Sequence, residues 1–279
     1  MKKQDVIIEM ILTEYIYQRD KMTQQTDEKD FLAHYDSQQF EQLSVTTDLL
    51  IFSISDVKTD NYRKLPEKMM SVYLIKRSQF PCKDKWSLAG GFVHPNETLE
   101  ETAKKVLKQK INLDNLYLEQ LYTFDKIDRD PRTRILSVGY MALVNRKELP
   151  SGIQQSNNWF NIQQTDSGLI LKNEQQSDMI FDLSNENCLA FDHAHIIQVG
   201  LNRLKNKIEY TDLAFHLVPH EFTLTELQNV YEAILGKKLL APAFRRVIKS
   251  RVQPTGHTTT GSGHRPSALF YYAGDKSII

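Results

Sequence analysis

The sequence predicts an α+β protein in which a three-layer α/β/α sandwich is followed by a smaller helical domain with a C-terminal hairpin. Strand-like and helical segments are mixed between residues 45 and 205, which is typical of a sheet covered by helices on both faces. Residues 206–279 have a different order of elements, with two short helices followed by two strand-like runs. A chain of 279 residues that is 41% hydrophobic and 25% charged can form two ordinary hydrophobic cores.

The first 44 residues predict an N-terminal extension that is helical at first and irregular over 27–44. Its apolar run is interrupted by Glu9 and Glu14 and lacks a small-residue cleavage site, which favours an amphipathic helix over a secretory signal. No window has the apolar length that a membrane span needs. The two cysteines, Cys82 and Cys188, argue against a disulfide framework. We therefore expect a cytoplasmic protein that does not enter a membrane.

The predicted sandwich, residues 45–205, has strands where β-branched and apolar residues are concentrated. These runs are 45–55, 69–78, 86–93, 116–125, 135–144, 169–173 and 178–184. Residues 56–68 predict a hairpin loop, and the Asn- and Gln-rich sequence around Trp159 predicts turns. Helices are expected over 98–110 and over about 192–205. The apolar face of the first helix consists of Leu99, Ala103, Val106 and Leu107.

The third predicted domain, residues 206–279, begins its regular structure with the helix FTLTELQNVYEAILG. A capping box is expected in which Thr223 and Glu226 exchange hydrogen bonds, and Gly236 provides a left-handed end. The buried stripe of this helix is Leu227, Val230, Tyr231 and Ile234. A second helix starts near Pro242 and reads AFRRVIKSR, with Phe244, Val247 and Ile248 facing inward. A strand, a turn rich in Gly and Thr, and another strand follow, which is the order of a winged helix-turn-helix.

A net charge of zero hides an asymmetry between the two ends of the chain. Residues 201–279 carry eleven Lys and Arg against six Asp and Glu, and the run 237–274 has seven basic residues and no acidic one. An acid-free tract of this length indicates contact with a polyanion, although a solvated basic face is the alternative. The candidate DNA contacts are Arg245 and Arg246 for base edges, Lys249 for phosphate, and His264 and Arg265 in the hairpin tip for the minor groove.

Residues 90–113 have the spacing of a Nudix box, G-x5-E-x7-R-E-U-x-E-E-x-G-U, where U is a bulky aliphatic residue. Gly91, Glu97, Leu107 and Leu113 fit the pattern. The remaining positions are occupied by Lys105, Val106, Gln109, Lys110 and Asn112. Mg²⁺ requires oxygen ligands, chiefly carboxylates, and this helix lacks them at the ligand positions. The sequence therefore predicts no catalytic residues and no metal ligands in the box, and Glu100 and Glu101 are interpreted as first-turn acids.

The chain resembles the Nudix-related transcriptional regulators, the NrtR-like family of bacterial repressors, in having a degenerate Nudix domain followed by a C-terminal winged helix. The most specific stretches are 118–143, 222–236 and 243–250. The resemblance implies a Nudix α/β/α sandwich that senses ADP-ribose, as in NAD metabolism, or a related nucleotide sugar or sugar phosphate; other branches of the family concern pentose use. It also implies a homodimer that binds palindromic, double-stranded operator DNA. No cofactor is required for such a function.

An effector site is expected at the polar insert between the strands 116–125 and 135–144. Arginine presents a planar fork suited to pyrophosphate oxygens, carboxylates suit ribose hydroxyls, and aromatic rings can stack on a base or a sugar. The candidates are Trp86, Phe124, Asp128, Arg129, Asp130, Arg132 and Tyr140. The alternative is an insert that only caps itself with salt bridges. His193 and His195, one residue apart, do not share a helical face and are interpreted as structural.

Two other functions remain open. One is a divergent Nudix hydrolase that acts on ADP-ribose or a related nucleoside diphosphate derivative, for which Mg²⁺ would be needed; acids outside the box, such as Glu119 or Asp125, would then have to replace the missing ligands. The other is a nucleotide-binding adaptor whose winged helix docks a protein. The acid-free basic tail favours DNA over a protein partner.

Overall fold

The computed structural model describes residues 13, 28–57, 67–113, 116–259 and 266–274. The chain divides into two compact units, Met1–Gln42 and Leu43–Ile279. No helix among the described residues is long and apolar enough to cross a membrane.

The described part of the smaller unit contains helix α2 (Glu28–His34) and the 3-10 turn η1 (Ser37–Gln39). The irregular structure predicted over 27–44 is therefore wrong for residues 28–34. Acidic residues in the first turn of α2 favour the helix through its dipole. The Tyr35 ring lies between two others: its centroid is 5.7 Å from that of Phe31 and 6.0 Å from that of Phe40. Apart from Thr13, the helix predicted at the start of the chain lies outside the described residues.

The larger unit is built around β1 (Ser44–Val57), a long central strand of an eight-stranded sheet among the described residues. The strand order is β10-β9-β8-β2-β1-β7-β6, and β5 (Ala89–Phe92) also pairs with β1. The other strands are β2 (Glu67–Tyr73), β6 (Tyr117–Phe124), β7 (Ile135–Leu143), β8 (Trp159–Thr165), β9 (Gly168–Asn173) and β10 (Ile180–Asp182). Strands β1 and β7 are parallel, and the remaining pairs of this sheet are antiparallel. A separate pair is formed by β3 (Ile75–Lys76) and β4 (Trp86–Ser87).

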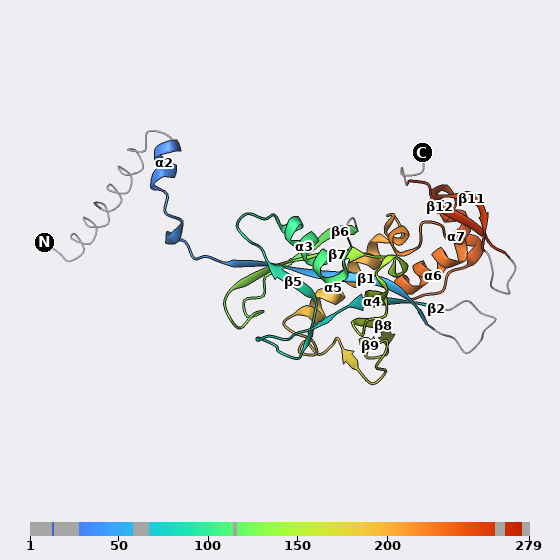
Figure 1. Cartoon of the computed structure of the whole chain (residues 1–279), viewed down its shortest axis with the longest axis horizontal. Helices are drawn as coiled ribbons and strands as arrows, with labels where there is room; N and C mark the ends of the chain where they lie inside the picture. The colour runs from blue at the N-terminus through green and yellow to red at the C-terminus, as the bar shows by residue number, and fades with distance from the viewer. Residues whose placement is uncertain (1–12, 14–27, 58–66, 114–115, 260–265, 275–279) are drawn as a thin grey trace, which may run out of the picture. The chain divides into compact units, whose positions relative to one another are not determined.

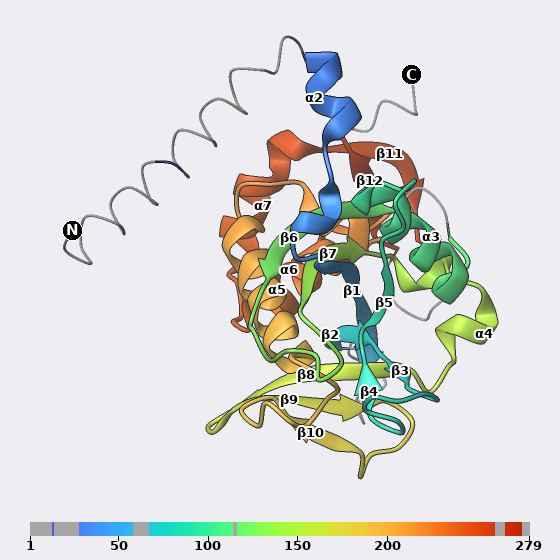
Figure 2. The same ribbon diagram turned by 90° about the vertical axis from the view of Figure 1, so that its left-hand side faces the viewer.

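Helices cover both faces of the sheet, as Figures 1 and 2 show for α3 (Leu99–Ile111) and α5 (His193–Lys207). Alternate side chains of a strand point to opposite faces. Leu49 and Ile51 accordingly belong to the apolar cluster of α3, whereas Leu50 and Phe52 belong to the cluster of α5. The prediction of an α/β/α sandwich is confirmed. Short turns of helix, η2 (Arg146–Glu148) and α4 (Ser151–Gln154), connect β7 to β8.

Strand β8 is an element for which the sequence prediction was wrong. Turns were expected around Trp159, but WFNIQQT pairs with both β2 and β9. Trp159 and Phe160 are fully buried on opposite faces, edge-on to Tyr73 at 5.1 Å and to Trp86 at 4.9 Å. Burial of these two rings outweighs the weak strand propensity of Asn and Gln.

The C-terminal domain has the element order of a winged helix-turn-helix (Figure 1). The 3-10 turn η3 (Leu213–Leu217) precedes α6 (Leu224–Leu235), α7 (Ala241–Ile248), η4 (Lys249–Arg251) and the antiparallel pair β11 (Val252–Thr258) and β12 (Ala268–Tyr272). Helix α6 begins after Thr223, whose Oγ1 accepts the Glu226 amide at 3.0 Å, and ends at Gly236 with φ 69°. The predicted stripe of α6 is buried.

Two details of this domain differ from the prediction. The Glu226 carboxylate does not complete a capping box but lies 3.4 Å from Lys147 Nζ and 3.6 Å from Lys68 Nζ, because two lysines of the sandwich face the start of α6. Val247 was expected to face inward, yet it is 65% exposed while Phe244 and Ile248 are buried. At 100° per residue, Val247 lies roughly 80° from the mean direction of that buried pair. The part of α7 that packs on the core is narrower than this angle, so Val247 remains exposed.

Candidate functional site

The loop before helix α3 and the end of that helix are held by residues of the Nudix-box pattern. Glu97 accepts a hydrogen bond from Thr102 Oγ1 at 3.1 Å and is paired with Lys105, the residue at the arginine position of the pattern. Asn112 replaces the last glycine and ends the helix in the left-handed conformation, with φ 53°. Asparagine is, after glycine, among the residues that adopt this conformation most readily. Both substitutions therefore preserve the local structure.

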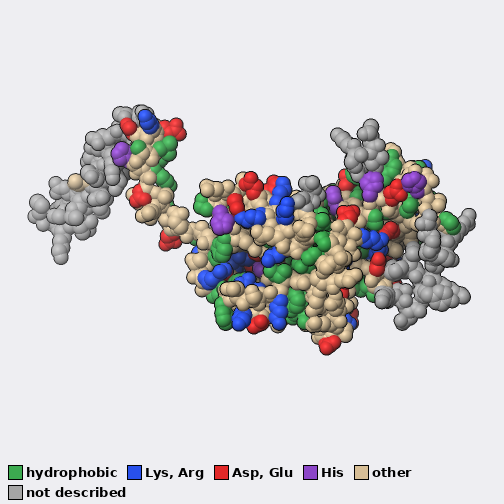
Figure 3. All heavy atoms as spheres, viewed as in Figure 1, with side chains coloured by type: hydrophobic (Ala, Val, Ile, Leu, Met, Phe, Trp, Pro, Cys, Tyr) green, Lys and Arg blue, Asp and Glu red, His purple; other side chains and the backbone are tan. Residues whose placement is uncertain are grey.

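The positions that would bind a metal ion have a different character. Val106 is buried in the apolar cluster beneath α3, and Lys110 brings an ammonium group. The hydrogen bond from Lys105 holds the pKa of Glu97 below its ordinary value, so this carboxylate is committed to a cation of the protein. Acidic and basic side chains lie together over α3 in Figure 3. Within the described ranges, no three His, Cys, Asp or Glu residues are grouped closely enough to hold a metal ion.

Glu119, considered above as a substitute ligand, is occupied by two cations. Its carboxylate accepts from Arg203 Nη1 at 3.1 Å and from Lys207 Nζ at 2.8 Å, both on α5. This contact fastens β6 to the last turns of α5.

On the opposite side of the sheet from α3, a buried ionic network surrounds Asp48 of β1. Asp48 Oδ2 accepts from Arg129 Nη2 at 3.1 Å and from Ser137 Oγ at 2.5 Å, and Asp48 Oδ1 lies 3.5 Å from His193 Nε2. Arg129 also donates to Asp192 from Nη2 at 2.6 Å and from Nε at 3.0 Å. Burial alone would raise the pKa of Asp48, but His193, Arg129 and Ser137 outweigh it and hold the pKa far below its ordinary value. Asp48 is therefore a buried carboxylate kept ionised by its neighbours.

Two further features show how closely this network is packed. A Cβ atom at Gly90 would lie 2.5 Å from Asp48 Oδ1 and 2.6 Å from the Thr47 carbonyl oxygen, so β5 can approach β1 here only as glycine. His193 Nδ1 accepts the Leu88 amide at 2.9 Å. In neutral imidazole the proton is then on Nε2, which faces Asp48. His193 is structural, as the sequence predicted.

A cavity of about 580 Å³ opens beside the network, in the size range of small-molecule sites. Its walls come from the end of β6, the β6–β7 loop, the loop before β4, the loop between β10 and α5, and the start of α5. They combine aromatic rings, cationic groups and carboxylates. The principal side chains are Tyr122, Phe124 and Phe191, then Lys85, Lys126 and Arg129, then Asp125, Asp128, Glu186 and Asp192.

The structure brings together some of the predicted effector residues and separates the others. Phe124, Asp128 and Arg129 line the cavity. The Arg129 side chain is only 4% exposed and is already engaged by Asp48 and Asp192, so it is paired with carboxylates outside the insert and not within it, as the alternative had expected. Local spacing could not show this, because its partners are 81 and 63 residues away in the sequence.

Arg132 and Asp130 lie away from the cavity. They form a bidentate pair, with Nε and Nη2 donating at 3.0 and 2.8 Å, and the guanidinium lies 5.3 Å from the Phe92 ring centroid. Of the two candidate arginines, only Arg129 therefore lines the cavity.

Trp86 and Tyr140 are core residues rather than exposed ring platforms. Trp86 packs with Phe160 in the cluster of α5, whereas Tyr140 belongs to the cluster of α3 on the other face of the sheet. A single ligand cannot contact both across the sheet.

Several cavity residues were not singled out by the sequence. Lys126 Nζ lies 3.9 Å from Asp128 Oδ1 and 3.6 Å from Glu186 Oε2, and Lys85 Nζ donates to the Asn187 carbonyl at 3.0 Å. His195, which was interpreted as structural from the sequence, also lines the cavity and is edge-on to Phe124, with centroids 5.9 Å apart. The position of Lys126 within the insert was a usable signal, whereas Lys85 reaches the cavity only through the tertiary fold.

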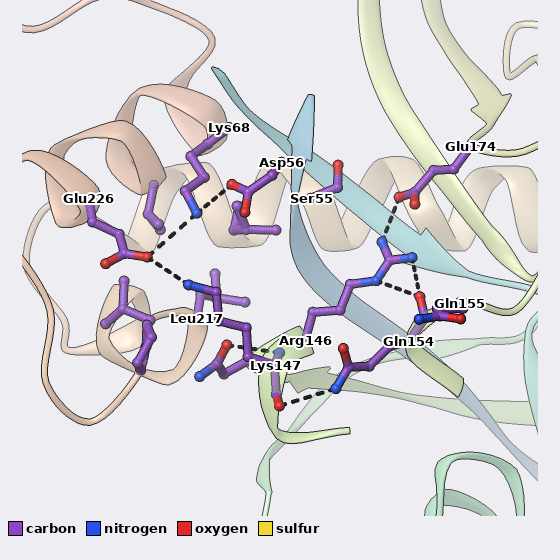
Figure 4. A pocket seen from close by; sticks show the side chains of 15 residues that line it. Ser55, Asp56, Lys68, Arg146, Lys147, Gln154, Gln155, Glu174, Leu217 and Glu226 are labelled. Atoms are coloured by element: carbon purple, nitrogen blue, oxygen red, sulfur yellow. Dashed lines mark hydrogen bonds and ion pairs between the residues drawn. The ribbon is translucent and has the colours of Figure 1, made fainter. Parts of the chain in front are cut away.

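The sandwich and the C-terminal domain meet at a polar cavity of about 240 Å³, shown in Figure 4. Lys68 Nζ lies 2.6 Å from Asp56 Oδ1 and also pairs with the carboxylate of Glu226 in α6. Lys147 pairs with the same Glu226 carboxylate. Arg146 Nη1 lies 2.7 Å from Glu174 Oε1 at the other end of the same cavity. Lys68, Lys147 and Glu226, here called the junction cluster, join the two domains by charge.

The exposed side of α7 is basic. Arg245, Arg246 and Lys249 are exposed, as predicted. Arg251, by contrast, is paired with Asp212 and donates to the Tyr231 hydroxyl at 3.2 Å, so it belongs to the domain's own packing. His264 and Arg265, the predicted contacts of the hairpin tip, lie outside the described residues.

Comparison with known proteins agrees with this arrangement. A NUDIX domain model matches residues 64–183, and a model of the NrtR DNA-binding winged helix domain matches residues 214–272. The ADPR responsive transcriptional repressor NtrR of Acinetobacter baylyi is 35% identical over 253 residues, which cover 89% of both chains. An ADP-ribose pyrophosphatase of Methanocaldococcus jannaschii is 31% identical over 132 residues, covering 47% of this chain and 66% of its own.

Two solved structures extend the likeness to the whole fold. A MutT/nudix family protein from Enterococcus faecalis superposes with a TM-score of 0.72 at 26% identity, covering 92% of this chain and 98% of that one. NrtR of Shewanella oneidensis, complexed with a 27mer DNA, superposes with a TM-score of 0.61 at 27% identity, covering 82% and 93%. The fold and the site thus define a Nudix domain joined to a DNA-binding winged helix. The chain belongs to the NrtR family of Nudix-related transcriptional regulators.

The two arginines of the β6–β7 loop should differ in their effect on stability. Arg129→Ala should lower the free energy of unfolding by about 3–5 kcal/mol, because it leaves a buried carboxylate without its cation. Arg132 is 45% exposed, while its buried partner Asp130 also accepts the Arg132 amide, so Arg132→Ala should cost less, about 1–3 kcal/mol. Urea unfolding followed by circular dichroism measures both. Equal losses would contradict the structural role assigned to Arg129.

The charge of Asp48 should make stability depend on pH. Because its pKa is depressed in the folded state, the ionised carboxylate adds stability above the unfolded pKa of about 3.9, and this contribution is lost as the pH falls below it. Wild type should exceed Asp48→Asn in stability at about pH 7, and the difference should shrink at about pH 3. A difference that is the same at both values would show that the charge is not the stabilising feature.

Proposed function

We propose that this protein is a transcriptional repressor that binds operator DNA through α7 and the β11–β12 hairpin, and that ADP-ribose or a related nucleotide sugar bound in the 580 Å³ cavity sets its DNA affinity. One observation carries the proposal: α3 keeps the structural pairs of a Nudix box without its metal ligands, in a chain whose winged helix exposes a basic helix. The Acinetobacter relative, named as an ADPR responsive repressor, supports the choice of ligand.

The chemistry of the cavity suits a ligand with a base, a ribose and a pyrophosphate. Phe124 and Phe191 offer ring faces or edges to a base. Lys126, which is 59% exposed, and Lys85 can turn toward phosphate oxygens. Asp128 can accept from ribose hydroxyls. Arg129 contributes indirectly, because it fixes the loop that carries the other groups.

Helix α5 provides a physical connection from this cavity to the winged helix. Asp192, its N-cap residue, binds Arg129 at the cavity wall. Leu204 and Ile208 at its other end share one apolar cluster with Leu227 and Val230 of α6. A ligand that binds one position of α5 better than another would shift the placement of α6 and α7. Two copies of the chain, as expected for a palindromic site, would present two α7 helices about 34–36 Å apart.

A Nudix hydrolase is the second candidate, favoured by the likeness to an ADP-ribose pyrophosphatase. On our proposal, ADP-ribose incubated with the protein and Mg²⁺ should be turned over far more slowly than about 1 s⁻¹, because Val106, Gln109 and Lys110 cannot supply a fixed set of oxygen ligands. Chromatographic release of AMP and ribose 5-phosphate measures this. Faster turnover that EDTA and Glu97→Gln both abolish would establish the hydrolase instead.

The effector proposal predicts coupling between two ligands. In mobility-shift assays with DNA upstream of the gene, ADP-ribose should change the operator Kd, and in calorimetry the operator should change the Kd of ADP-ribose by the same factor. Lys126→Ala should weaken ADP-ribose binding by about tenfold to a hundredfold, the cost of losing a charged hydrogen bond.

Arg132→Ala is the matched control, since Arg132 is an exposed arginine of the same loop that does not line the cavity. It should bind ADP-ribose as wild type does. If Arg132→Ala weakens binding and Lys126→Ala does not, the effector binds beside Arg132 and Phe92 and not in the cavity. If saturating ADP-ribose leaves the DNA affinity unchanged, ADP-ribose is not an effector of this protein.

A further inference from the structure

Helix α7 carries an exposed apolar flank that its packing does not explain. Leu240 at the N-cap is 80% exposed, Val247 is 65% exposed, and Ala243 is also exposed. These residues are spaced i, i+3 and i+7, which places them on one side of a helix. Phe244 and Ile248, on a different side, make the contact with the core. The apolar flank, defined as Leu240, Ala243 and Val247, is therefore free of the domain's own packing.

The position of this flank relative to the basic residues limits what can cover it. Arg246 projects almost directly away from the buried pair Phe244 and Ile248, and the apolar flank lies beside it. The charged residues between 237 and 274 are all basic. Single exposed apolar side chains need no explanation, but three on one side of α7 and its N-cap, bordered by arginine, form a mixed apolar and cationic surface.

We propose that the apolar flank contacts the C5-methyl groups of thymines in the major groove, and that Val247 thereby determines a base preference within each half-site. This rests on the proposed function in DNA binding. In the major groove, thymine is distinguished by its methyl group and its O4 acceptor, and small apolar side chains recognise the methyl. The phosphates beside such a step complement the cations that border the flank. A protein partner would need acidic groups to match those cations and is the outcome that the test separates.

The test uses a change that removes only the methyl group. A duplex is selected from a random pool by the full-length wild-type protein, and its thymines are replaced one at a time by deoxyuridine, which keeps base pairing and O4. At one or two positions of each half-site, uridine should weaken wild-type binding about threefold to fivefold, the effect of one buried methyl. Val247→Ala should weaken binding to the thymine duplex by a similar factor. At the thymine that Val247 contacts, the Val247→Ala protein should bind the thymine and uridine duplexes with the same affinity.

Arg246→Ala is the matched control on the same helix. It should lower affinity for the thymine and uridine duplexes by the same factor, so that their ratio stays as in wild type. Lys249→Ala should reduce the salt dependence of binding by about one unit without changing that ratio. Val247 is exposed, so Val247→Ala should unfold at the wild-type urea concentration, which separates contact from folding.

The outcomes are distinct. A thymine-to-uridine ratio in Val247→Ala that equals the wild-type ratio at every position overturns the proposal while leaving DNA binding intact. Normal DNA binding by Val247→Ala together with a changed oligomeric state assigns the flank to protein contact and also overturns it. If the wild-type protein enriches no duplex at all, the proposed function in DNA binding itself fails.

Discussion

The interaction on which the candidate site depends is the buried carboxylate of Asp48. An ionised group in the core is tolerated only when charges and hydrogen bonds compensate for lost water, and here they come from separate elements. Ser137 belongs to β7, Arg129 to the β6–β7 loop and His193 to α5. Satisfying one charge therefore fixes the position of a strand, a loop and a helix start. That loop and that helix start form two walls of the larger cavity, so the network fixes part of its shape.

In the degenerate box, the residues at the metal-ligand positions have changed while the local backbone structure is maintained. The Glu97–Lys105 pair and the left-handed Asn112 preserve the loop and the helix end with substitutes of the same physical type. Val106, by contrast, exchanges a ligand position for apolar packing. The residues that hold the backbone and those that would hold a metal ion are different residues of one helix. Loss of the second set therefore does not disturb the surface on the other face of the sheet, where the larger cavity lies.

Much of this architecture could be predicted from residue periodicity, because a strand or helix with one buried face carries its pattern in consecutive residues. The prediction failed where the deciding partner was remote. Strand β8 forms because Trp159 and Phe160 meet Tyr73 and Trp86. Arg129 and Arg132 are three residues apart but have different roles, because only Arg129 forms ion pairs with Asp48 and Asp192. Val247 was misplaced for the opposite reason: its apolar character suggested burial, but α7 is held only through Phe244 and Ile248.

The contrast between the two charged sites bears on how a signal could pass through the molecule. The Asp48 network is buried, and separating Arg129 from Asp48 or Asp192 would leave an unpaired charge, so the network ties the start of α5 to the loop. In the junction cluster, Lys147 is 60% exposed and its 3.4 Å contact with Glu226 is replaceable by water. In the proposed function, a ligand-dependent shift of α5 would therefore move the β6–β7 loop with it. In the proposed function, such a shift would be taken up where the sandwich meets α6, which packs against α7 through Tyr231 and Phe244.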